Sequence, residues 1–483
     1  MSTLYRHDHL FIGGRQVAPT SDETVEVISP STEEPVGRVP CAGREDVDAA
    51  VAAARAAFRD PDGWRTWPAG ERAAALDRLA GLLDERIDEL TTLLAWETGR
   101  PVGGRRASTL RGSELLRYYA EVIRTLVTEE RRAAPEATSP IRHSIVRREP
   151  IGVTAAITPY NGSLTLPMYK LAPALAAGGT AVFKPPPQAP LESYLLAEAV
   201  AASGIPDGVL NIVPGDARTG EWLVTHPGID KIGFTGSTAA GRRIAELAGR
   251  ALKPVTLELG GKSAAILLED ADLSAFVGSL GVLGFLFSGQ NCFIHSRILA
   301  PRRRYTEVVE AVTAFAAGLA VGDPFDPATR IGPLITAEHR DRVASYVRSG
   351  LDEGARLTTG GGAPDRPGWY FEPTVFADAT NDMRICQEEI FGPVLAVIPY
   401  DTEEEALTLA GDSDFGLAGS VWTADEERGV ALASRVDSGS VGVNGFGFNT
   451  AAPFAGRRGS GLGVELGVEA LASYLRFQAV HLL

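Results

Sequence analysis

Residues 151–187 of the chain read IGVTAAITPYNGSLTLPMYKLAPALAAGGTAVFKPPP. In this stretch, short apolar runs at 153–157 and 180–183 enclose a helical segment at 168–177. This alternation is typical of buried strands joined by crossover helices. It continues with strands at 209–213, 231–234 and 255–259 and with helices at 191–202, 220–226 and 239–252. Because such crossovers are right-handed, the sequence predicts a mostly parallel, doubly wound sheet.

The pattern resumes after Gly260 and predicts a second domain of the same class. Its strands are expected at 264–268, 296–299, 375–377, 394–400, 420–422 and 440–443, and its helices at 305–319 and 337–353. Further helices are expected at 44–58, 70–85 and 87–98. The predicted fold class is therefore α/β, with two doubly wound parallel-sheet domains.

Two segments fit neither sheet, and we expect them to form a small β element that pairs subunits. They are the polar stretch at 128–148 and the C-terminal tail at 470–483, where apolar and polar residues alternate weakly and indicate an edge strand. The chain is then divided into a first domain at 1–127 and 149–258, a second at 259–465 and the β element at 128–148 and 466–483.

The composition of the 483-residue chain excludes several classes of protein. It is 45% hydrophobic and 22% charged, which excludes a disordered, collagenous or coiled-coil protein. A formal net charge of −15 repels phosphate backbones, so we expect no nucleic-acid partner. The longest uncharged stretch, 273–291, is interrupted by glycines and predicts no membrane span. Three cysteines and an N-terminus without a signal-type core indicate a soluble cytoplasmic protein.

Cys292 is the candidate nucleophile. It lies in FSGQNCF at 287–293, where glycine lets the chain turn and present the thiol. Glu258 lies at a predicted strand end in apolar surroundings, which should raise its pKa and make it a usable base. Asn161, at another strand end, offers an amide donor for an oxyanion. The alternatives are a buried structural cysteine, a Glu258 paired with Lys262 and an ordinary turn at Asn161.

A candidate anion site follows the fourth predicted strand. The segment GFTGSTAAG at 233–241 would expose the N–H groups of Gly236 and Ser237 at a helix N-terminus. A plain turn with a serine N-cap explains the same residues. The seven histidines show no metal-ligand spacing and no G-x-S-x-G elbow is present, so we expect neither a metal site nor a serine hydrolase.

Ten ordered motifs resemble those of the aldehyde dehydrogenase superfamily, over almost the whole chain. They are EPIGV at 149–153, LAPALAAG at 171–178, KP at 184–185, GIPDGVLN at 204–211, FTGS at 234–237, LELGGK at 257–262, GQNC at 289–292, VGDP at 321–324, EEIFGPV at 388–394 and PFAG at 453–456. The resemblance implies a cofactor-binding domain and a catalytic domain, and oxidation of an aldehyde to its carboxylic acid. Cys292 would form a thiohemiacetal and then a thioester, with Asn161 and the Cys292 N–H holding the oxyanion. Glu258 would activate the water that hydrolyses the thioester.

The resemblance also implies a nicotinamide cofactor, NAD or NADP. The residues expected to bind it are Thr158, Pro159, Tyr160, Lys184, Pro187, Gly215, Phe234, Thr235, Gly236, Ser237, Leu259, Glu389 and Phe391. Pro187 stands where NAD-using relatives often have a glutamate that binds the ribose diol, so NADP is tolerated in this interpretation. No arginine follows to attract a 2′-phosphate, and NAD remains the favoured cofactor.

The substrate is expected to be an apolar aliphatic or aromatic aldehyde. The residues expected to line its pocket are Gly162, Leu166, Tyr169, Leu286, Phe293, Phe448 and Phe454. Gly162 replaces a bulky residue of the family pattern and predicts a wider pocket at that wall. No arginine or lysine is expected where it could bind a substrate carboxylate.

The resemblance also implies a homodimer or homotetramer. Two other interpretations of the function remain open. One alternative is a CoA-acylating relative, although such relatives commonly lack the glutamate base that is present here as Glu258. The other is a non-catalytic scaffold on the same fold. If Cys292 is catalytic, its thiol is expected to have a low pKa and to be alkylated faster than Cys41 and Cys386.

Overall fold

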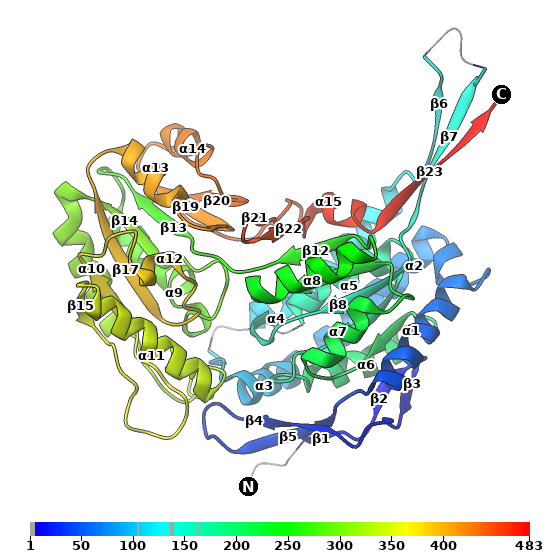
Figure 1. Cartoon of the computed structure of the whole chain (residues 1–483), viewed down its shortest axis with the longest axis horizontal. Helices are drawn as coiled ribbons and strands as arrows, with labels where there is room; N and C mark the ends of the chain where they lie inside the picture. Colours follow the sequence, from blue (N-terminus) through cyan, green and yellow to red (C-terminus); the bar gives the residue numbers. More distant parts are fainter. Residues whose placement is uncertain (1–4, 104–105, 136–139, 163) are drawn as a thin grey trace.

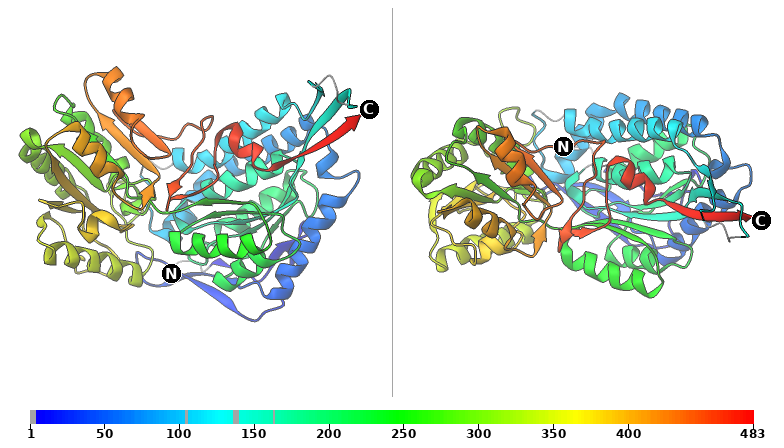
Figure 2. Two further views of the ribbon diagram at one scale, coloured as in Figure 1. Left: turned by 45° about the horizontal axis from the view of Figure 1, so that its top comes forward. Right: turned by 90° about the horizontal axis from the view of Figure 1, so that it is seen from above.

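The computed structural model describes the backbone of residues 5–103, 106–135, 140–162 and 164–483, and the side chains of these ranges except at 106–110. Figure 1 shows two lobes, each built on a central sheet flanked by helices, and a narrow sheet that projects from one lobe. The turned views in Figure 2 place this narrow sheet, with the C-terminus, at one end of the molecule. The two α/β lobes agree with the predicted fold class.

The first lobe contains an eight-stranded sheet in the order β22-β12-β11-β8-β9-β10-β2-β3. Its five central strands are parallel and match the five predicted runs: β8 (Val153–Ile157), β9 (Thr180–Lys184), β10 (Leu210–Ile212), β11 (Lys231–Thr235) and β12 (Val255–Glu258). The edge strands are antiparallel to their neighbours: β2 (Leu10–Ile12), β3 (Arg15–Val17) and β22 (Gly461–Leu462). The sheet is thus less uniformly parallel than predicted, because short strands from distant parts of the chain complete both edges.

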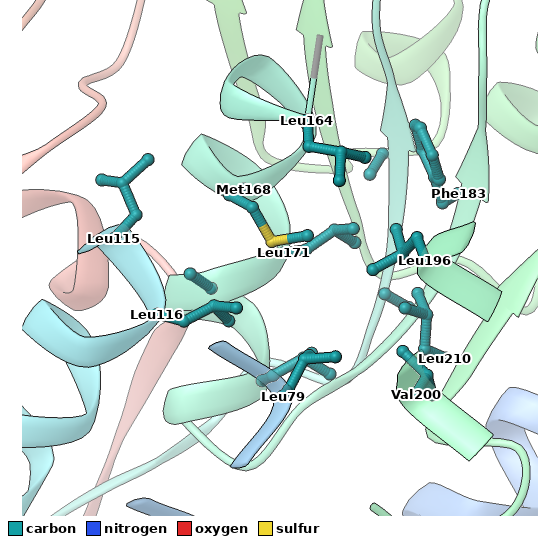
Figure 3. Packing of buried hydrophobic residues seen from close by; sticks show 14 of the residues in the cluster. Leu79, Leu115, Leu116, Leu164, Met168, Leu171, Phe183, Leu196, Val200 and Leu210 are labelled. Atoms are coloured by element: carbon teal, nitrogen blue, oxygen red, sulfur yellow. The ribbon is translucent and has the colours of Figure 1, made fainter. Parts of the chain in front are cut away.

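Helices cover both faces of this sheet. One face carries α1 (Arg44–Arg59), α7 (Ala217–Thr225) and α8 (Thr238–Arg250). The other carries α5 (Thr165–Ala176) and α6 (Glu192–Ala202), backed by α2 (Ala69–Glu85), α3 (Ile87–Thr98) and α4 (Arg106–Thr125). Figure 3 shows the core on this second face, where Leu79 of α2, Leu116 of α4 and Leu171 of α5 converge. Burial of these side chains fixes α5, which follows the end of β8 and carries several of the predicted site residues.

The second lobe contains a seven-stranded sheet in the order β15-β16-β17-β14-β13-β19-β20. Its strands are β13 (Ala264–Leu267), β14 (Arg297–Pro301), β15 (Arg356–Thr359), β16 (Thr374–Ala377), β17 (Val394–Tyr400), β19 (Ala418–Trp422) and β20 (Ser440–Val443). All are parallel except β15, an edge strand that the sequence pattern did not predict. One face packs against α9 (Leu273–Leu283) and α10 (Tyr305–Ala317), and the other against α11 (Ala337–Asp352), α12 (Arg384–Gln387), α13 (Glu403–Gly411) and α14 (Glu426–Ala433). In the chain, η3 (Leu286–Gly289) follows α9 and comes shortly before Cys292.

The projecting sheet has three antiparallel strands in the order β23-β7-β6. They are β6 (Glu129–Ala133), β7 (His143–Pro150) and β23 (Leu475–Leu482), and the short helix α15 (Gly467–Ala472) precedes the last of them. The C-terminal strand lies at the edge of this sheet, as its alternating pattern predicted. Two small sheets were not predicted. One contains β1 (Tyr5–Arg6), β4 (Thr24–Ile28) and β5 (Pro35–Pro40), and the other contains β18 (Phe415–Gly416) and β21 (Arg457–Arg458). Among the described residues, no helix is both long and apolar enough to cross a bilayer.

Candidate active site

Three neighbouring strands of the first sheet end at one place. β8 ends at Ile157, β11 at Thr235 and β12 at Glu258. The pairing register sets Thr235 opposite Glu258, and it sets the residue before Thr235 opposite Ile157. Because ligands bind at the carboxyl ends of such parallel strands, this edge is the expected site. Asn161 follows β8 in a short 3-10 turn and reaches the same edge.

The loop that presents Cys292 has a constrained backbone. Three consecutive residues of η3 have positive φ angles: 51° at Phe287, 54° at Ser288 and 75° at Gly289. Left-handed conformations at non-glycine residues cost free energy and persist where the surroundings fix them. Here the Arg100 guanidinium packs 4.8 Å from the centroid of the Phe287 ring. The turn expected before Cys292 is present, and contacts from the first lobe support it.

Gln290 connects this loop to the end of β8. Its backbone carbonyl accepts a hydrogen bond from Asn161 Nδ2 at 2.9 Å, and its Oε1 accepts one from the Tyr160 hydroxyl at 3.1 Å. Arg100 Nη2 donates to the Asn161 carbonyl at 3.3 Å. An amide nitrogen carries two N–H groups, so Asn161 has a second donor beside the cysteine loop. The hydrogen bonds of Gln290 and Arg100 therefore connect the cysteine loop, the end of β8 and Asn161. Sequence reasoning did not predict these contacts.

The surroundings of the half-buried Cys292 thiol raise its pKa. Burial is the largest cause, and the negative charges of Glu389 and Glu258 add to it. The backbone N–H of Cys292 has the opposite effect, because it donates toward the sulfur. The expectation of a low pKa is therefore wrong for the protein by itself, since the charges that act on the thiol are mainly carboxylates.

Glu258 is buried, with 3% of its surface exposed, and neither carboxylate oxygen has a hydrogen-bond partner among the described residues. Burial raises its pKa well above the usual value, and the charge of Glu465 raises it further. Lys170, which forms an ion pair with Glu465, and the Gly456 N–H act in the opposite direction. The direction of this shift is the one expected from the sequence. The alternative pairing with Lys262 is not formed, because Lys262 Nζ has no partner in the described part of the chain.

Lys184 and Gly215 meet at the ends of β9 and β10. Lys184 Nζ donates to the carbonyls of Pro185 and Gly215, both at 2.9 Å. Burial lowers the pKa of Lys184 to about 8. An ammonium group has three N–H donors, so one remains for a ligand beyond these two bonds. Pro187 is half-buried in the loop that follows.

Two cavities contain other residues predicted to bind the cofactor. Thr158, Pro159 and Tyr160 line one of about 310 Å³, and the buried Thr158 Oγ1 has no partner among the described residues. Glu389 and Phe391 line another of about 240 Å³ beside the cysteine loop. Glu389 Oε1 accepts a backbone N–H at 3.0 Å, and burial raises the pKa of this carboxyl to about 7.

The junction of β11 and α8 differs from the expectation in one respect. Ser237 caps α8, and its Oγ accepts the Ala240 N–H at 3.3 Å. The Gly236 N–H donates to the Glu258 carbonyl at 3.0 Å, so the expectation that it is open to a phosphate is wrong. This amide instead extends the hydrogen bonding between β11 and β12. The other residues predicted at the junction are buried: Phe234, Thr235 and Leu259.

An aromatic cluster lies next to Cys292. The Phe448 ring is centred 5.1 Å from Phe293 and 5.0 Å from Phe454. Phe446 is stacked on Phe293 at 5.9 Å. Cys292 and the Phe446 and Phe448 rings pack against one hydrophobic cluster of the first lobe. The structure therefore brings the predicted phenylalanines together at the thiol.

The space beside Gly162 is filled. A Cβ atom at Gly162 would lie 2.1 Å from Leu166 Cγ, so the Leu166 side chain occupies the room that the glycine leaves. The expectation of a wider pocket at this wall is wrong for that reason. Tyr169, one helical turn further along α5, is buried. Leu286 is half-buried at the start of η3, where its carbonyl accepts a hydrogen bond from Asn291 Nδ2 at 2.8 Å.

Arg111 is a further residue at the aromatic cluster. Its guanidinium carbon lies 5.4 Å from the centroid of the Phe448 ring, and its side chain hydrogen-bonds to the Tyr169 hydroxyl. Sequence reasoning did not place this arginine at the aromatic cluster. Arg111 belongs to α4, a helix that the sequence analysis did not predict, and no motif marks it.

Comparison with known proteins identifies the family. Residues 17–480 match the aldehyde dehydrogenase family. The chain is 48% identical over 482 residues to a geranial dehydrogenase of Castellaniella defragrans, with 99% of each chain covered. An aldehyde dehydrogenase of Mycobacterium tuberculosis complexed with NAD+ matches with a TM-score of 0.95 and 46% identity, over 100% of this chain and 99% of that chain. Aldehyde dehydrogenase C of Pseudomonas syringae, solved as a cysteine-to-alanine mutant with NAD+ and octanal, matches with a TM-score of 0.94 and 38% identity, over 99% and 98%. The chain belongs to the aldehyde dehydrogenase family.

This membership confirms the resemblance inferred from the ordered motifs. The structural matches confirm the predicted fold class. They also confirm the predicted enzyme class, an oxidoreductase of the aldehyde dehydrogenase type.

Proposed function

We propose that this chain oxidises an aldehyde with an apolar skeleton to its carboxylic acid with NAD, through a covalent intermediate on Cys292. The observation that carries the proposal is the convergence of three groups at one sheet edge. The half-buried thiol of Cys292, the unpartnered carboxylate of Glu258 and the spare amide donor of Asn161 all lie there. A nucleophile, a base and an oxyanion donor are the parts that acyl chemistry requires.

The first half of the reaction forms a bond between sulfur and carbon. Because its pKa is raised, Cys292 enters the reaction as a thiol, and Glu258 accepts its proton. The sulfur attacks the aldehyde carbon, and the carbonyl oxygen becomes an oxyanion held by the Cys292 N–H and Asn161 Nδ2. The nicotinamide, when bound, accepts the hydride that leaves this carbon, and a thioester on Cys292 remains.

The second half of the reaction releases the acid. Glu258, once it has lost its proton, removes a proton from water, and the resulting hydroxide attacks the thioester carbon. The carbon–sulfur bond breaks, so that the acid leaves and the Cys292 sulfur is restored. A buried carboxylate with a raised pKa suits both transfers, since it binds and releases protons nearer neutrality than an exposed one.

NAD fits the polar groups at the strand ends. The third N–H of Lys184 and the N-terminus of α8 at Ser237 offer donors for ribose and phosphate oxygens. Thr158 Oγ1 and the Glu389 carboxylate offer partners for hydroxyl groups. The relatives solved with NAD+ support this choice. NADP remains a possible second cofactor, because Pro187 presents no carboxylate to repel a 2′-phosphate.

An apolar substrate skeleton is supported by the ring cluster of Phe293, Phe448 and Phe454. The names of two relatives agree with it, since one is a geranial dehydrogenase and another was solved with octanal. Both compounds carry a hydrocarbon skeleton on an aldehyde.

The arrangement of the chain is part of this proposal. Residues 1–127 and 149–258 form the cofactor-binding domain, and residues 259–465 form the catalytic domain. Residues 128–148 and 466–483 join subunits into a homodimer or homotetramer, supported by the projecting strand β23 with its exposed Phe477. A cytoplasmic location is supported by three cysteines that form no disulfide.

The proposal is tested with purified protein, NAD and octanal, by following reduced nicotinamide in the steady state and in the first turnover. Cys292→Ala should abolish both phases, whereas Cys386→Ala, a control at another buried cysteine, should retain them. Glu258→Gln should abolish the steady state and weaken any burst, since Glu258 serves both halves. Asn161→Ala should lower kcat about 100-fold or more through loss of one oxyanion donor.

Two outcomes would overturn the proposal. Wild-type turnover that requires CoA and yields an acyl-CoA would assign the chain to the acylating relatives. A folded wild-type protein that binds NAD yet oxidises no aldehyde in an aliphatic and aromatic series would support the scaffold interpretation.

A further inference from the structure

Arg111 differs from the other arginines of α4 whose side chains the structure describes. Arg117 forms an ion pair with Asp84, and Arg124 forms one with Asp77, both near the surface of the first lobe. Arg111 forms no ion pair among the described residues; its side chain is half-buried and packs over the Phe448 ring. A half-buried cation without an anionic partner is costly, so its position calls for an explanation.

Tyr169 links Arg111 to the reacting sulfur. The charges of both Arg111 and Cys292 act on the Tyr169 hydroxyl, whose pKa is raised mainly by burial. The Phe448 ring, on which the guanidinium packs, is centred 5.1 Å from the ring of Phe293, the residue after Cys292. The guanidinium therefore lies at the aromatic cluster that adjoins Cys292.

The carboxylates that the structure describes near this pocket form no ion pair with Arg111. Glu465 is neutralised by its ion pair with Lys170. Glu258 has a raised pKa and is assigned to the proton transfers at Cys292. An anionic group on the substrate would complement the guanidinium, and a planar fork of five N–H donors matches a carboxylate in a bidentate geometry.

We propose that Arg111 is a specificity-determining residue that binds a carboxylate at the end of the substrate remote from the aldehyde. The preferred substrates are then ω-oxo carboxylates, in which an apolar chain along Phe293 and Phe448 separates the two groups. This inference rests on the proposed aldehyde oxidation at Cys292 and adds the class of substrate. It also explains why an arginine packs on the aromatic cluster beside Cys292.

The test compares pairs of substrates of equal chain length, an unbranched alkanal and the corresponding ω-oxo carboxylate, by kcat/KM. In Arg111→Met, kcat/KM for the ω-oxo carboxylates should fall at least about tenfold, because a charge-assisted hydrogen bond is lost. The value for the alkanals should stay the same or rise. The kcat/KM of Arg111→Lys for the ω-oxo carboxylates should lie between those of the wild type and Arg111→Met, since lysine keeps the charge but lacks the planar fork of N–H donors. The matched control is Arg117→Met, an exposed arginine of the same helix that should change neither value.

A binding measurement separates recognition from stability. A dicarboxylate of the same length, which cannot react, should inhibit the wild type competitively and inhibit Arg111→Met at least about tenfold more weakly. Equal losses for both members of each pair, or a wild type that prefers the alkanal, would overturn the role of Arg111 while leaving aldehyde oxidation intact. Failure of both substrates with wild-type protein would instead overturn the proposed function, and with it this inference. If Arg111→Met does not fold, the kcat/KM values of Arg111→Lys and the inhibition of the wild type by the dicarboxylates test the role of Arg111 instead.

Discussion

At the scale of single residues, the pH dependence of the reaction depends on the pair of carboxyls Glu258 and Glu465. The charge of Glu465 raises the pKa of Glu258, and Lys170 lowers it. A general base acts in its ionised form, so the rate falls as the pH drops through the pKa of Glu258. Glu465→Gln removes a negative charge, lowers that pKa and should move the acid limb of the pH–rate profile to lower pH.

The measurement is the steady-state rate from acid to neutral pH for the wild type and Glu465→Gln. Glu469→Gln, an exposed carboxyl on α15, is the control and should leave the limb in place. A limb that stays fixed or moves to higher pH in Glu465→Gln would contradict this electrostatic coupling. The unfolding midpoint should fall in the same variant, because Lys170 loses its ion-pair partner.

The sequence marked Glu258 at the end of a readable strand and Cys292 in a glycine-containing loop, and their catalytic roles stay predictions. The sequence was not sufficient for the wall beside Gly162 or for Arg111. Leu166 fills the space beside Gly162 through the packing of α5 on the preceding turn. Arg111 reaches the pocket because α4 packs against α5, a contact between segments that spacing along the chain does not encode.

At the scale of elements, a comparison of two helix caps distinguishes residues that only stabilise a helix from residues that also bind the cofactor. Ser237 caps α8 at the proposed phosphate site, and Thr402 caps α13 in the other lobe. Replacement of either by alanine should cost about 1 kcal/mol of stability through loss of a capping hydrogen bond. Ser237→Ala should also raise the KM for NAD, whereas Thr402→Ala should not. An equal KM in both variants would show that α8 does not contact the cofactor.

Among the elements, periodicity succeeded where a segment is long or buried on both faces, as in the central strands of both sheets. It failed for β2 and β3, the three-residue strands of a local hairpin that joins the sheet only where Phe11 of β2 pairs with the distant Ile212 of β10. The helix α4 was overlooked although Leu115, Tyr119 and Ile123 are buried at helical spacing. A local sequence pattern likewise could not predict the antiparallel edge strands of both sheets, since the tertiary fold determines which strand pairs at an edge.

At the scale of the whole molecule, we expect the subunits to associate through the projecting sheet. Its outer strand β23 (Leu475–Leu482) has an unpaired edge and exposes 72% of Phe477 and 40% of Val480. A strand edge with exposed apolar side chains is a template for pairing, and burying it in a second copy removes apolar surface from water. Phe477→Asp combined with Val480→Asp should therefore shift the protein from an oligomer to monomers in sedimentation velocity. Leu351→Asp, an exposed leucine on α11, is the control and should leave the oligomer intact. A wild-type protein that sediments as a monomer, or a double variant that stays oligomeric, would contradict the assignment of this sheet to subunit pairing.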